Sequence, residues 1–466
     1  MKLKRKITSF YIAIFCSFTS HASADEMYIK QIDKMTGSAI PFTVISNDLK
    51  NNAIEKGMIE IRNGGYGSDM TAHPTNKNQF YALTDRGPNA VYKNEQYGAG
   101  KIFPIADYTP RIGLFEVQKY GQIVLIKNIL LKRPDGTLIT GLPNSSALGG
   151  TGETPYSATG DPIVEDPTKP FDAKSNKIKL DDFGLDGEGL AALDDGTFWV
   201  SDEYGPHLVH FDKNGIEIGR INPFVNDGRN QLNLPAEFAN RRANRGMEGL
   251  AITPDQTTLV GTMQSTMLNP NKTVKDLNLV RIVSVNLKTK EVQQFLYKQE
   301  KNQNANSGIA ALSDNQFLVI ERDGSFLRDK KDAMKHIYRI DLDSGTDLES
   351  IENNGVLTQD PKLGLLINGQ TLEQAVLDHG WDVLKKNNIN VVNKSLVVDL
   401  VKELKYPHDK LEGMWIINSN TLAVINDDDF SMWSKAGKLE QKYLDNNKIV
   451  IDNSTLYVID DVALKK

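Results

Sequence analysis

One short phrase, an acidic residue and glycine followed by apolar residues, recurs along the chain and constrains its fold more than any other feature. It is clearest at residues 188–193, EGLAAL, and returns at 248–253 as EGLAIT, at 307–312 as SGIAAL and at 412–417 as EGMWII. A more distant copy, DMTAHP, occupies residues 69–74. Each copy leads through a polar turn into a second apolar run, for example TFWVSDE or QFLVIER. The pattern predicts antiparallel strands joined by tight turns.

The spacing of the copies indicates the architecture. The step from Glu188 to Glu248 is 60 residues, and the step on to Ser307 is 59. The steps from Asp69 to Glu188 and from Ser307 to Glu412 are 119 and 105 residues, which leaves room for a drifted unit or an insertion in each. Repeats of this length are typical of four-stranded propeller blades. We therefore expect an all-β fold, a β-propeller of six or seven four-stranded blades with short helical insertions. A β-sandwich with chance Glu-Gly pairs is the alternative.

The first 24 residues have the features of a signal peptide. Four basic residues precede a short apolar run, and Ala22-Ser23-Ala24 is a suitable cleavage site. The single cysteine, Cys16, lies in the apolar run behind Phe15, where a lipoprotein signal would have a small residue. We expect cleavage after Ala24 and a periplasmic or secreted protein. No other apolar segment is long enough to span a membrane, so we expect no membrane span in the mature protein.

Residues 25–466 are expected to form a single propeller domain with two insertions. The first, residues 134–184, is rich in Gly, Ser, Thr and Pro, and we expect it to lie over one face. The second, residues 353–400, contains an amphipathic pattern at Thr371–Lys386 that predicts a helix. The last strand, Ser454–Ile459, is expected to complete a blade together with the N-terminal part of the chain.

Composition excludes several classes of function. The formal net charge is −6, so we expect no nucleic acid as a partner, because nucleic-acid binding requires basic patches. The chain has no G-x-S-x-G motif, no P-loop and no dinucleotide fingerprint, so a nucleophile-elbow esterase and nucleotide-dependent enzymes are not supported.

Acidic residues occupy corresponding places in the repeats. In a propeller blade the first strand begins at the face where the second strand ends, and acids stand at both places: Glu188 lies 14 residues before Asp202 and 15 before Glu203. We therefore expect the acids to converge at one end of the axial channel. Oxygen donors suit a hard cation, so the predicted cofactor is calcium. The alternative for each acid is a turn residue that accepts backbone hydrogen bonds. The predicted metal ligands are Asp85, Glu188, Asp202, Glu248, Glu321, Glu412 and Asp427, with Asp428 as a further neighbour.

Arginines stand beside these acids in the same loops. Arg86 follows Asp85, Arg322 follows Glu321, and Arg245 precedes Glu248. Arginine binds phosphate or carboxylate groups bidentately, so these side chains are expected either to hold an anionic substrate or to pair with the neighbouring acids. The candidate catalytic residues are Glu188, Asp202, Glu203, Glu248, Arg86, Arg245 and Arg322. His73 and His207 are expected near the acidic face as acid/base partners.

These segments carry a resemblance to a known family. DGEGLAALDDGTFWVSDEYGPHLVHFDKNG, RRANRGMEGLAITPD, LVIERDGSF and KLEGMWIINSNTLAVINDDDF resemble the phytase-like propeller family, which is described by an esterase-like activity of phytase. The resemblance runs from about Gly57 to Asp461. It implies a β-propeller, export, hydrolysis of phosphate or other esters, and calcium by analogy with alkaline propeller phytases. Ser307 departs from the pattern because it lacks the leading acid. The positions that carry the family motifs are Asp85, Arg86, Glu188, Asp202, Glu203, Arg245, Glu248, Glu321, Arg322, Glu412 and Asp427.

Three functions follow from these patterns. The first is an exported metal-dependent hydrolase of a small anionic ester, with a phosphate ester favoured. The second is a lactonase-like propeller in which a metal polarises a ring ester. The third is a propeller without catalytic activity that binds a ligand, or a protein partner through the 134–184 loop.

Overall fold

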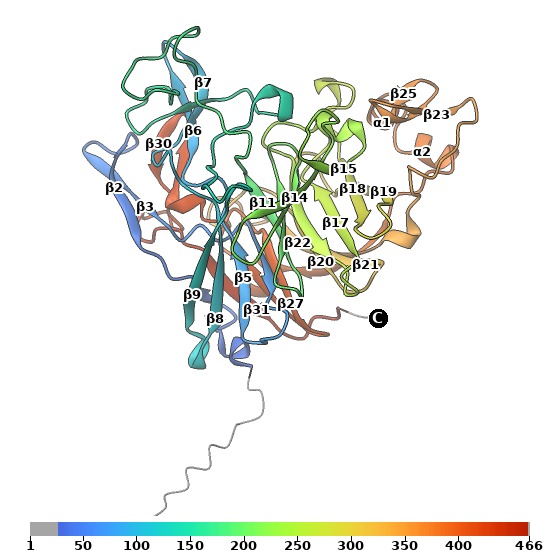
Figure 1. Ribbon diagram of the computed structural model, residues 1–466. Coiled ribbons are helices and arrows are strands. Elements are labelled where there is room, and N and C mark those ends of the chain that lie inside the picture. Colours follow the sequence, from blue (N-terminus) through green and yellow to red (C-terminus); the bar gives the residue numbers. More distant parts are fainter. Residues whose placement is uncertain (1–26, 465–466) are drawn as a thin grey trace, which may run out of the picture.

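Each copy of the recurring phrase lies in the first strand of its own sheet in the computed structural model, which describes residues 27–464 (Figure 1). The predicted signal peptide, residues 1–24, lies outside the described residues. The chain is all-β and its described part is divided among many small sheets. Five of these sheets have four or five strands.

The five larger sheets are listed here in chain order, from the innermost strand outwards. The first contains β4 (Asp69–Ala72), β5 (Gln79–Leu83), β8 (Arg111–Val117) and β9 (Ile123–Leu130). The second contains β11 (Gly187–Ala192), β12 (Phe198–Asp202), β13 (Leu208–Phe211), β14 (Glu217–Asn222) and β15 (Asn230–Asn233). The third contains β16 (Met247–Ile252), β17 (Thr258–Met263), β18 (Leu279–Asn286) and β19 (Val292–Lys298).

The fourth sheet contains β20 (Ala305–Ala311), β21 (Gln316–Arg322), β22 (Lys335–Asp341) and β26 (Asn393–Asp399). The fifth contains β27 (Gly413–Asn418), β28 (Thr421–Ile425), β31 (Thr455–Ile459) and β1 (Ser38–Ala39). Strands from both ends of the chain thus complete the fifth sheet, as the sequence predicts for β31. Neighbouring strands are antiparallel throughout the five sheets except for β14 and β15, which are parallel.

The glycine of the recurring phrase is required by the close approach of the inner strands. A Cβ on Gly189 would lie 2.6 Å from the backbone nitrogen of Leu250 in the next sheet, and a Cβ on Gly249 would lie 2.9 Å from the Cα of Gly308. A Cβ on Gly308 would overlap the carbonyl oxygen of Glu412. The inner strands contact one another in the order β4, β11, β16, β20 and β27, and β27 contacts β4 again. No larger residue fits at these positions without moving a neighbouring strand.

The described residues form five sheets of this kind rather than six or seven. The two long steps between copies contain insertions instead of further units. Between the first two copies lies a three-stranded sheet of β6 (Ala90–Asn94), β7 (Gly98–Ile102) and β10 (Thr154–Tyr156). Between the last two lie β23 (Leu357–Asp360), β24 (Gly364–Ile367) and β25 (Gln370–Thr371) with two short helices.

The predicted helix at Thr371–Lys386 is divided. It consists of α1 (Leu372–His379) and α2 (Asp382–Lys386), and Gly380 between them has a φ of 73°. Arg281 on β18 anchors α1, because its Nε lies 2.8 Å from Glu373 Oε1. Residues 393–399, at the end of the predicted insertion 353–400, form β26 of the fourth sheet. A third helix, α3 (Leu400–Leu404), follows it.

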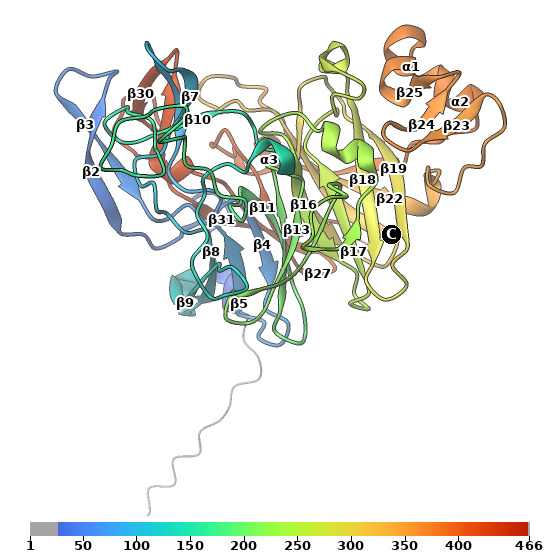
Figure 2. The same ribbon diagram turned by 45° about the horizontal axis from the view of Figure 1, so that its top comes forward.

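Two further pairs, β2 (Val44–Asn51) with β3 (Gly57–Arg62) and β29 (Met432–Lys435) with β30 (Lys438–Gln441), pack beside β6 and β7. Both views place these small sheets on the left, above the first sheet with β5, β8 and β9 (Figures 1 and 2). Their shared core includes Ile59, Ile102, Tyr108, Phe430 and Met432. The 3₁₀ helices are Tyr28–Gln31, Lys119–Gly121, Ser146–Leu148, Ala236–Asn240, Lys272–Val274, Leu342–Ser344 and Asp429–Ser431.

A cavity of about 200 Å³ lies between the five inner strands. Its lining includes Met70, Leu190, Leu250, Ile309 and Met414, one from each strand. Residues at the C-terminal ends of these strands also line the cavity. The cavity therefore lies opposite to the acidic residues, which stand where the strands begin. The lining of this cavity includes no acidic side chain, whereas acidic residues gather at the other end of the inner strands.

We expect the closing strand β31 to contribute strongly to stability. Leu456 is fully buried in the core between the first and fifth sheets. Leu456→Ala should lower the free energy of unfolding by about 2–5 kcal/mol, because it leaves a cavity in a packed core. Urea denaturation at fixed metal concentration measures this. The control Ile449→Ala changes a side chain that is 76% exposed and should cost less than about 0.5 kcal/mol. Equal effects of the two substitutions would contradict the arrangement of β31.

Candidate functional site

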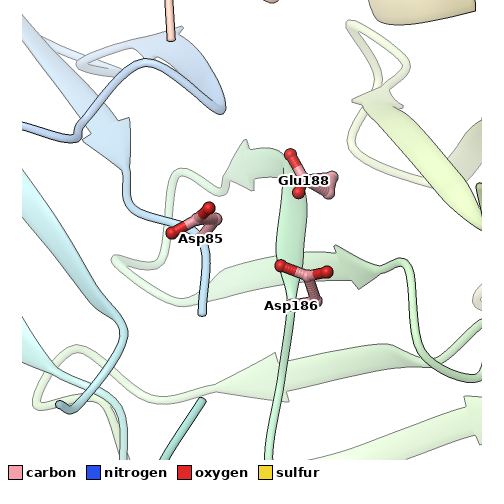
Figure 3. A group of neighbouring side chains, drawn as sticks. All are labelled: Asp85, Asp186 and Glu188. Atoms are coloured by element: carbon pink, nitrogen blue, oxygen red, sulfur yellow. The ribbon is translucent and has the colours of Figure 1, made fainter. Parts of the chain in front are cut away.

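Buried carboxylates meet where the inner strands begin. Asp85 follows β5, and Asp186 and Glu188 stand at the start of β11 (Figure 3). One carboxylate oxygen of each of these three residues lies within 4.8 Å of the others, and all three side chains are buried. The sequence predicts Asp85 and Glu188 as ligands but misses Asp186. A partial signal was present, because Asp186 stands only two residues before Glu188, although the bulge at Glu188 interrupts the regular alternation of the strand.

A β-bulge directs the leading acid of the phrase. The strand register shifts between Gly187 and Gly189, and again between Met247 and Gly249, so Glu188 and Glu248 are the extra residues of the two bulges. A bulge re-aims its side chain and commonly lies near a functional site. The same shift occurs around Ser307, whose Oγ donates a hydrogen bond to the Leu411 carbonyl at 2.6 Å.

Glu188 has no direct partner for its charge among the described residues. Its side chain is buried, and the described part of the chain gives its carboxylate neither a hydrogen bond nor an ion pair. Burial raises the pKa of Glu188 well above its usual value, and the nearby carboxylates of Glu248, Asp186 and Glu412 raise it further. The carboxylate form therefore requires a cation, or the carboxyl group stays protonated.

The other two members of the group are partly neutralised. The pKa of Asp85 is raised well above its usual value by burial and by Asp427 and Asp186, although the Gly87 N–H donates to its Oδ1 at 2.7 Å. Asp186 Oδ2 lies 2.5 Å from Arg86 Nη2. Asp186 Oδ1 accepts a hydrogen bond from the Arg86 backbone N–H at 3.3 Å, so both oxygens of Asp186 contact Arg86.

Two of the three predicted arginines pair with acids. Arg86 Nη2 also lies 3.6 Å from Glu203 Oε2. Arg322 Nη2 pairs closely with Glu412 and lies 3.7 Å from Glu248 Oε1. Of the two roles that the sequence leaves open for these side chains, the geometry favours pairing with acids. Arg245 differs, because its Nη1 is buried and no acceptor bonds to it among the described residues.

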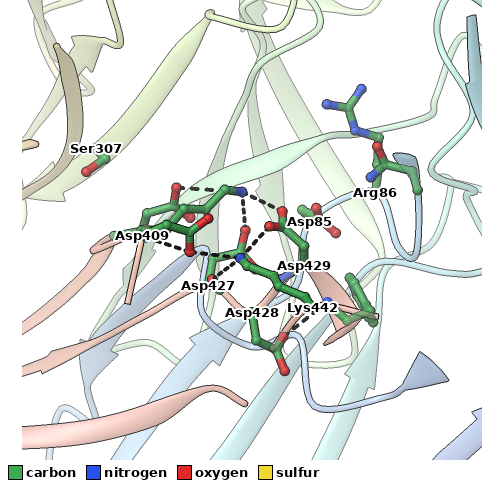
Figure 4. Close-up of polar contacts among 12 residues, drawn as sticks. Asp85, Arg86, Ser307, Asp409, Asp427, Asp428, Asp429 and Lys442 are labelled. Atoms are coloured by element: carbon green, nitrogen blue, oxygen red, sulfur yellow. Dashed lines mark hydrogen bonds and ion pairs between the residues drawn. The ribbon is translucent and has the colours of Figure 1, made fainter. Parts of the chain in front are cut away.

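Lysines that the sequence analysis did not single out balance the acids of the fifth sheet. Lys410 Nζ lies 2.5 Å from Asp427 Oδ2 and 2.7 Å from Asp429 Oδ1. Lys442 Nζ lies 2.5 Å from Asp429 Oδ2 and 3.0 Å from Asp409 Oδ1 (Figure 4). The charge of Asp427 is therefore already compensated.

Asp202 and Glu203 have different roles although they are adjacent. Asp202 accepts hydrogen bonds from the backbone N–H groups of Asp186 (2.7 Å) and Gly205 (2.8 Å), so it holds the turn after β12. Burial raises the pKa of Asp202 to about 7. Glu203 instead lies near Arg86, whose Nη2 is 3.6 Å from Glu203 Oε2. Gln264 Nε2 donates to Glu203 at 3.2 Å and to Glu248 at 2.5 Å. Burial also raises the pKa of Glu203 and, more strongly, that of Glu248.

Glu412 and Asp428 are also buried. Burial raises the pKa of Glu412 to about 7, against the opposing effects of Lys410 and Arg322. Burial and the neighbouring Asp427 raise the pKa of Asp428 to about 8. Asp428 Oδ1 accepts a hydrogen bond from the Phe430 N–H at 3.1 Å, so this residue stabilises a turn.

The prediction of Glu321 as a ligand of the same site is wrong. Its carboxylate accepts hydrogen bonds from Tyr297 Oη (2.8 Å), Lys394 Nζ (2.9 Å) and Asn304 Nδ2 (2.6 Å), away from the group around Glu188. Neighbouring residues of a strand point in opposite directions, so Arg322, and not Glu321, reaches the acids.

His73 and His207 are not members of the acidic group. His73 follows β4 at the end opposite to Asp69, accepts a hydrogen bond from the Asn76 N–H and stacks on Tyr81. It is therefore not at the acidic face, contrary to the prediction. His207 is buried beside Phe224, and burial lowers its pKa well below the usual value. A neutral imidazole is expected there.

The insertion 134–184 reaches the edge of the acidic group. Tyr204 Oη donates to the Gly141 carbonyl at 2.6 Å, and Asn244 Nδ2 donates to Glu153 Oε1 at 2.9 Å. Arg86 Nη1 in turn donates to Asn244 Oδ1 at 2.9 Å. Part of this loop thus packs over the face at which the acids gather.

The donor set fits a hard cation. Asp85, Asp186 and Glu188 offer carboxylate oxygens, which are the ligands that calcium and magnesium prefer. The Glu188 carboxylate forms no direct ion pair among the described residues, although it is close enough to Lys410 to raise the pKa of that lysine. These three residues could therefore hold a metal ion.

A family model for phytase-like proteins, described as "Esterase-like activity of phytase", matches residues 61–430. The chain belongs to this family. A curated relative from Arthroderma benhamiae, called an uncharacterized secreted protein, is 29% identical over 168 residues. The match covers 32% of each protein, so the chain spans about a third of that relative.

Solved structures with similar arrangements are distant. The PQQ-bound aldose sugar dehydrogenase of Streptomyces coelicolor is 10% identical, with a TM-score of 0.32 and coverage of 90% of this chain and 98% of that chain. The periplasmic gluconolactonase PpgL of Pseudomonas aeruginosa is 11% identical, with a TM-score of 0.31 and coverage of 92% and 98%. Among the described residues of this chain, no helix is both long and apolar enough to cross a membrane.

The unbalanced charge of Glu188 should be visible in the stability of the metal-free protein. A carboxyl group whose pKa is raised on folding stabilises the protein fully below its unfolded pKa, and this stability is lost as the pH rises through the folded pKa. Glu188→Gln removes this loss. The free energy of unfolding of the variant should therefore exceed that of the wild type at pH 8 and approach it at pH 4.

Chemical denaturation in the presence of a chelator, at several pH values, measures the difference. Glu55→Gln, which makes the same change at an exposed position, is the control and should leave the profile unchanged. A Glu188→Gln protein that is less stable than the wild type at pH 8 would show that the carboxylate has a stabilising partner.

Proposed function

We propose that this protein is an exported, metal-dependent hydrolase that cleaves a small anionic ester, a phosphate ester in particular, at the acidic face. The observation that carries the proposal is the carboxylate of Glu188, which is buried without a hydrogen bond or ion pair among the described residues and lies beside Asp85 and Asp186. Membership of the phytase-like family supports ester hydrolysis as the reaction class.

Asp85, Asp186 and Glu188 would hold the metal ion, and calcium is the first candidate because all three donors are carboxylates. A bound divalent cation would polarise the ester and acidify a water molecule. Arg86 keeps Asp186 in place through its 2.5 Å ion pair. Arg322 does the same for Glu412 and Glu248. In this arrangement two of the three predicted arginines position acids, and Arg245 remains for the substrate.

Glu203 and Glu248 are the proposed acid/base residues. Gln264 donates to both carboxyl groups, and the pKa of each is raised by burial and by neighbouring acids. A carboxyl group with a raised pKa can accept or donate a proton near neutral pH. Asp202 is less suitable, because both of its oxygens accept backbone hydrogen bonds.

We infer that the five larger sheets are the blades of a closed five-bladed propeller. The inner strands contact one another in a cycle, and the glycines make this approach sterically feasible. The predicted signal peptide and the secreted relative support export to the periplasm or the medium. A binding protein without catalytic activity is the second candidate, because the loop that includes Gly141 and Glu153 packs against the acidic face.

Calcium titration tests the metal site. We expect the mature, metal-stripped protein to bind calcium, and Glu188→Gln to weaken binding by at least about tenfold, since a tenfold change corresponds to only about 1.4 kcal/mol. Isothermal titration calorimetry measures both affinities. Glu321→Gln changes a buried acid outside the group and should bind calcium like the wild type. No binding by the wild type would remove calcium from the proposal.

Activity is tested separately with phosphomonoesters, phosphodiesters, carboxyl esters and lactones, each with and without calcium. We expect calcium-dependent turnover of a phosphate ester that Glu188→Gln abolishes. Cleavage of lactones alone would favour the lactonase-like alternative. Calcium binding without turnover of any ester would favour the binding protein.

A further inference from the structure

Four cationic side chains near the acidic group have no carboxylate partner among the described residues. Arg241 and Arg242 donate hydrogen bonds to Tyr204 O and Gln303 Oε1, and Lys101 and Arg245 remain. Arg86, Arg322, Lys410 and Lys442 each form an ion pair of 4.0 Å or less. In the part of the chain that the structure describes, Lys101 has a single hydrogen bond and no ion pair, and Arg245 has a buried Nη1 with no acceptor. Arg245 is one of the predicted residues, whereas Lys101 comes from an insertion that the sequence analysis did not connect with the site.

Lys101 is held over the turn that follows Asp85. It lies on β7, where it pairs with Val91 of β6 and Pro155 of β10. Its Nζ donates to Asn89 Oδ1 at 3.1 Å. Asn89 Nδ2 donates to the Gly87 carbonyl at 3.0 Å, which ties this side chain to the Asp85–Gly87 turn. The small sheet β6–β7–β10 therefore brings an amine to the edge of the candidate metal site.

Arg245 approaches the same group from the third sheet. Its turn packs against the end of the second sheet so closely that a Cβ on Gly246 would overlap the Glu203 carbonyl oxygen. Burial lowers the pKa of Arg245, as does the neighbouring Arg242, while Glu248 and Glu203 raise it. Burial and Arg86 lower the pKa of Lys101 in the same way. Both cations thus lie near Glu203 and carry charge that their surroundings compensate only in part.

Hydrogen bonds connect the segments that flank the two positions. Arg86 Nη1 donates to Asn244 Oδ1, and Asn244 Nδ2 donates to Glu153 Oε1, each at 2.9 Å. Glu153 directly precedes Thr154, which pairs with Gly100 next to Lys101. Lys101, Glu153, Asn244 and Arg245 are half-buried, whereas Asp186, Glu203 and Glu248 beneath them are buried. We refer to these four residues as the rim, because they are the more exposed members of this group.

We propose that Lys101 and Arg245 together bind the anionic group of the substrate, a phosphate monoester, at this rim. The proposal rests on the hydrolase function and adds Lys101 as a substrate-binding residue. Guanidinium groups bind phosphate bidentately, and an ammonium group contributes a point charge. A neutral lactone would gain nothing from two unpaired cations, so the pair would select for a dianionic substrate.

Inorganic phosphate is the probe for this pair. We expect the calcium-loaded mature protein to bind phosphate, and Lys101→Met and Arg245→Gln each to weaken binding by about tenfold, the loss of one charge-assisted contact. Calcium affinity should be kept or slightly increased in both variants, because each removes a positive charge near the carboxylates. Retained calcium binding also shows that the variants fold.

Two controls make the same charge changes nearby. Lys93→Met alters an exposed lysine on β6 of the same small sheet, and Arg242→Gln alters an arginine that donates to Gln303 Oε1 at 2.9 Å. Both should bind phosphate like the wild type. If the controls lost as much phosphate affinity as Lys101→Met and Arg245→Gln, only the overall positive charge of this region would attract phosphate. This result would overturn the proposal.

The proposal and the hydrolase function can fail separately. Phosphate binding by Lys101→Met and Arg245→Gln that equals wild-type binding overturns the rim assignment, and calcium-dependent ester cleavage by the wild type would still support the hydrolase. A wild type that cleaves lactones but binds no phosphate also overturns the rim assignment. A wild type that binds phosphate through Lys101 and Arg245 but cleaves no ester supports the rim and contradicts the hydrolase.

Discussion

The close approach of the five inner strands is the constraint on which the rest of the structure depends. Gly189, Gly249 and Gly308 each face the backbone of the next inner strand at a distance that excludes a Cβ. Asp69, in the copy without glycine, instead accepts a hydrogen bond from the Leu190 N–H at 2.7 Å. Because the strands are so close, every side chain at their first positions is brought toward the same axis. Glu188 before Gly189 and Glu248 before Gly249 are therefore placed among other acids by the packing of the sheets.

This convergence brings like charges together, and neighbouring cations neutralise only some of them. Like charges in a buried region repel one another, and burial further disfavours the charged form. Arg86, Arg322 and Lys410 neutralise the acids around the edge of the group. Glu188 has no such partner among the described residues, so its environment favours either a proton or a metal ion. A site that retains an unbalanced buried charge costs stability in the empty protein, and such sites are characteristic of function.

Much of the fold could be predicted from the sequence, because each copy of the recurring phrase marks the inner strand of one sheet. The closing strand at Ser454–Ile459 and the acids at the strand starts follow from the same repeat. The number of sheets could not be predicted, since a step of 119 or 105 residues contains either a drifted blade or an insertion, and periodicity alone does not distinguish them. The insertions pack in hydrophobic clusters, and that of the second insertion includes Leu279 and Leu296 of the third sheet.

The site was predictable only in part for a related reason. Spacing places an acid near the correct end of a strand but does not fix which of two neighbours points inward, so Glu321 and Arg322 were both expected at the site although only Arg322 reaches it. The bulges at Glu188 and Glu248 add one residue and change that parity. Lys101 and Lys410 lie outside the repeated phrase, so no pattern marked them. Only the packing of the small sheets and loops brings these lysines to the acids.

The most direct test of the account is a crystal structure of the mature protein grown with calcium, with data collected at a wavelength where calcium scatters anomalously. The account predicts an anomalous peak bound by oxygens of Asp85, Asp186 and Glu188, at about 2.3–2.6 Å from each bonded oxygen. The absence of a peak in this group at millimolar calcium, with the Glu188 carboxyl hydrogen-bonded to water instead, would contradict it.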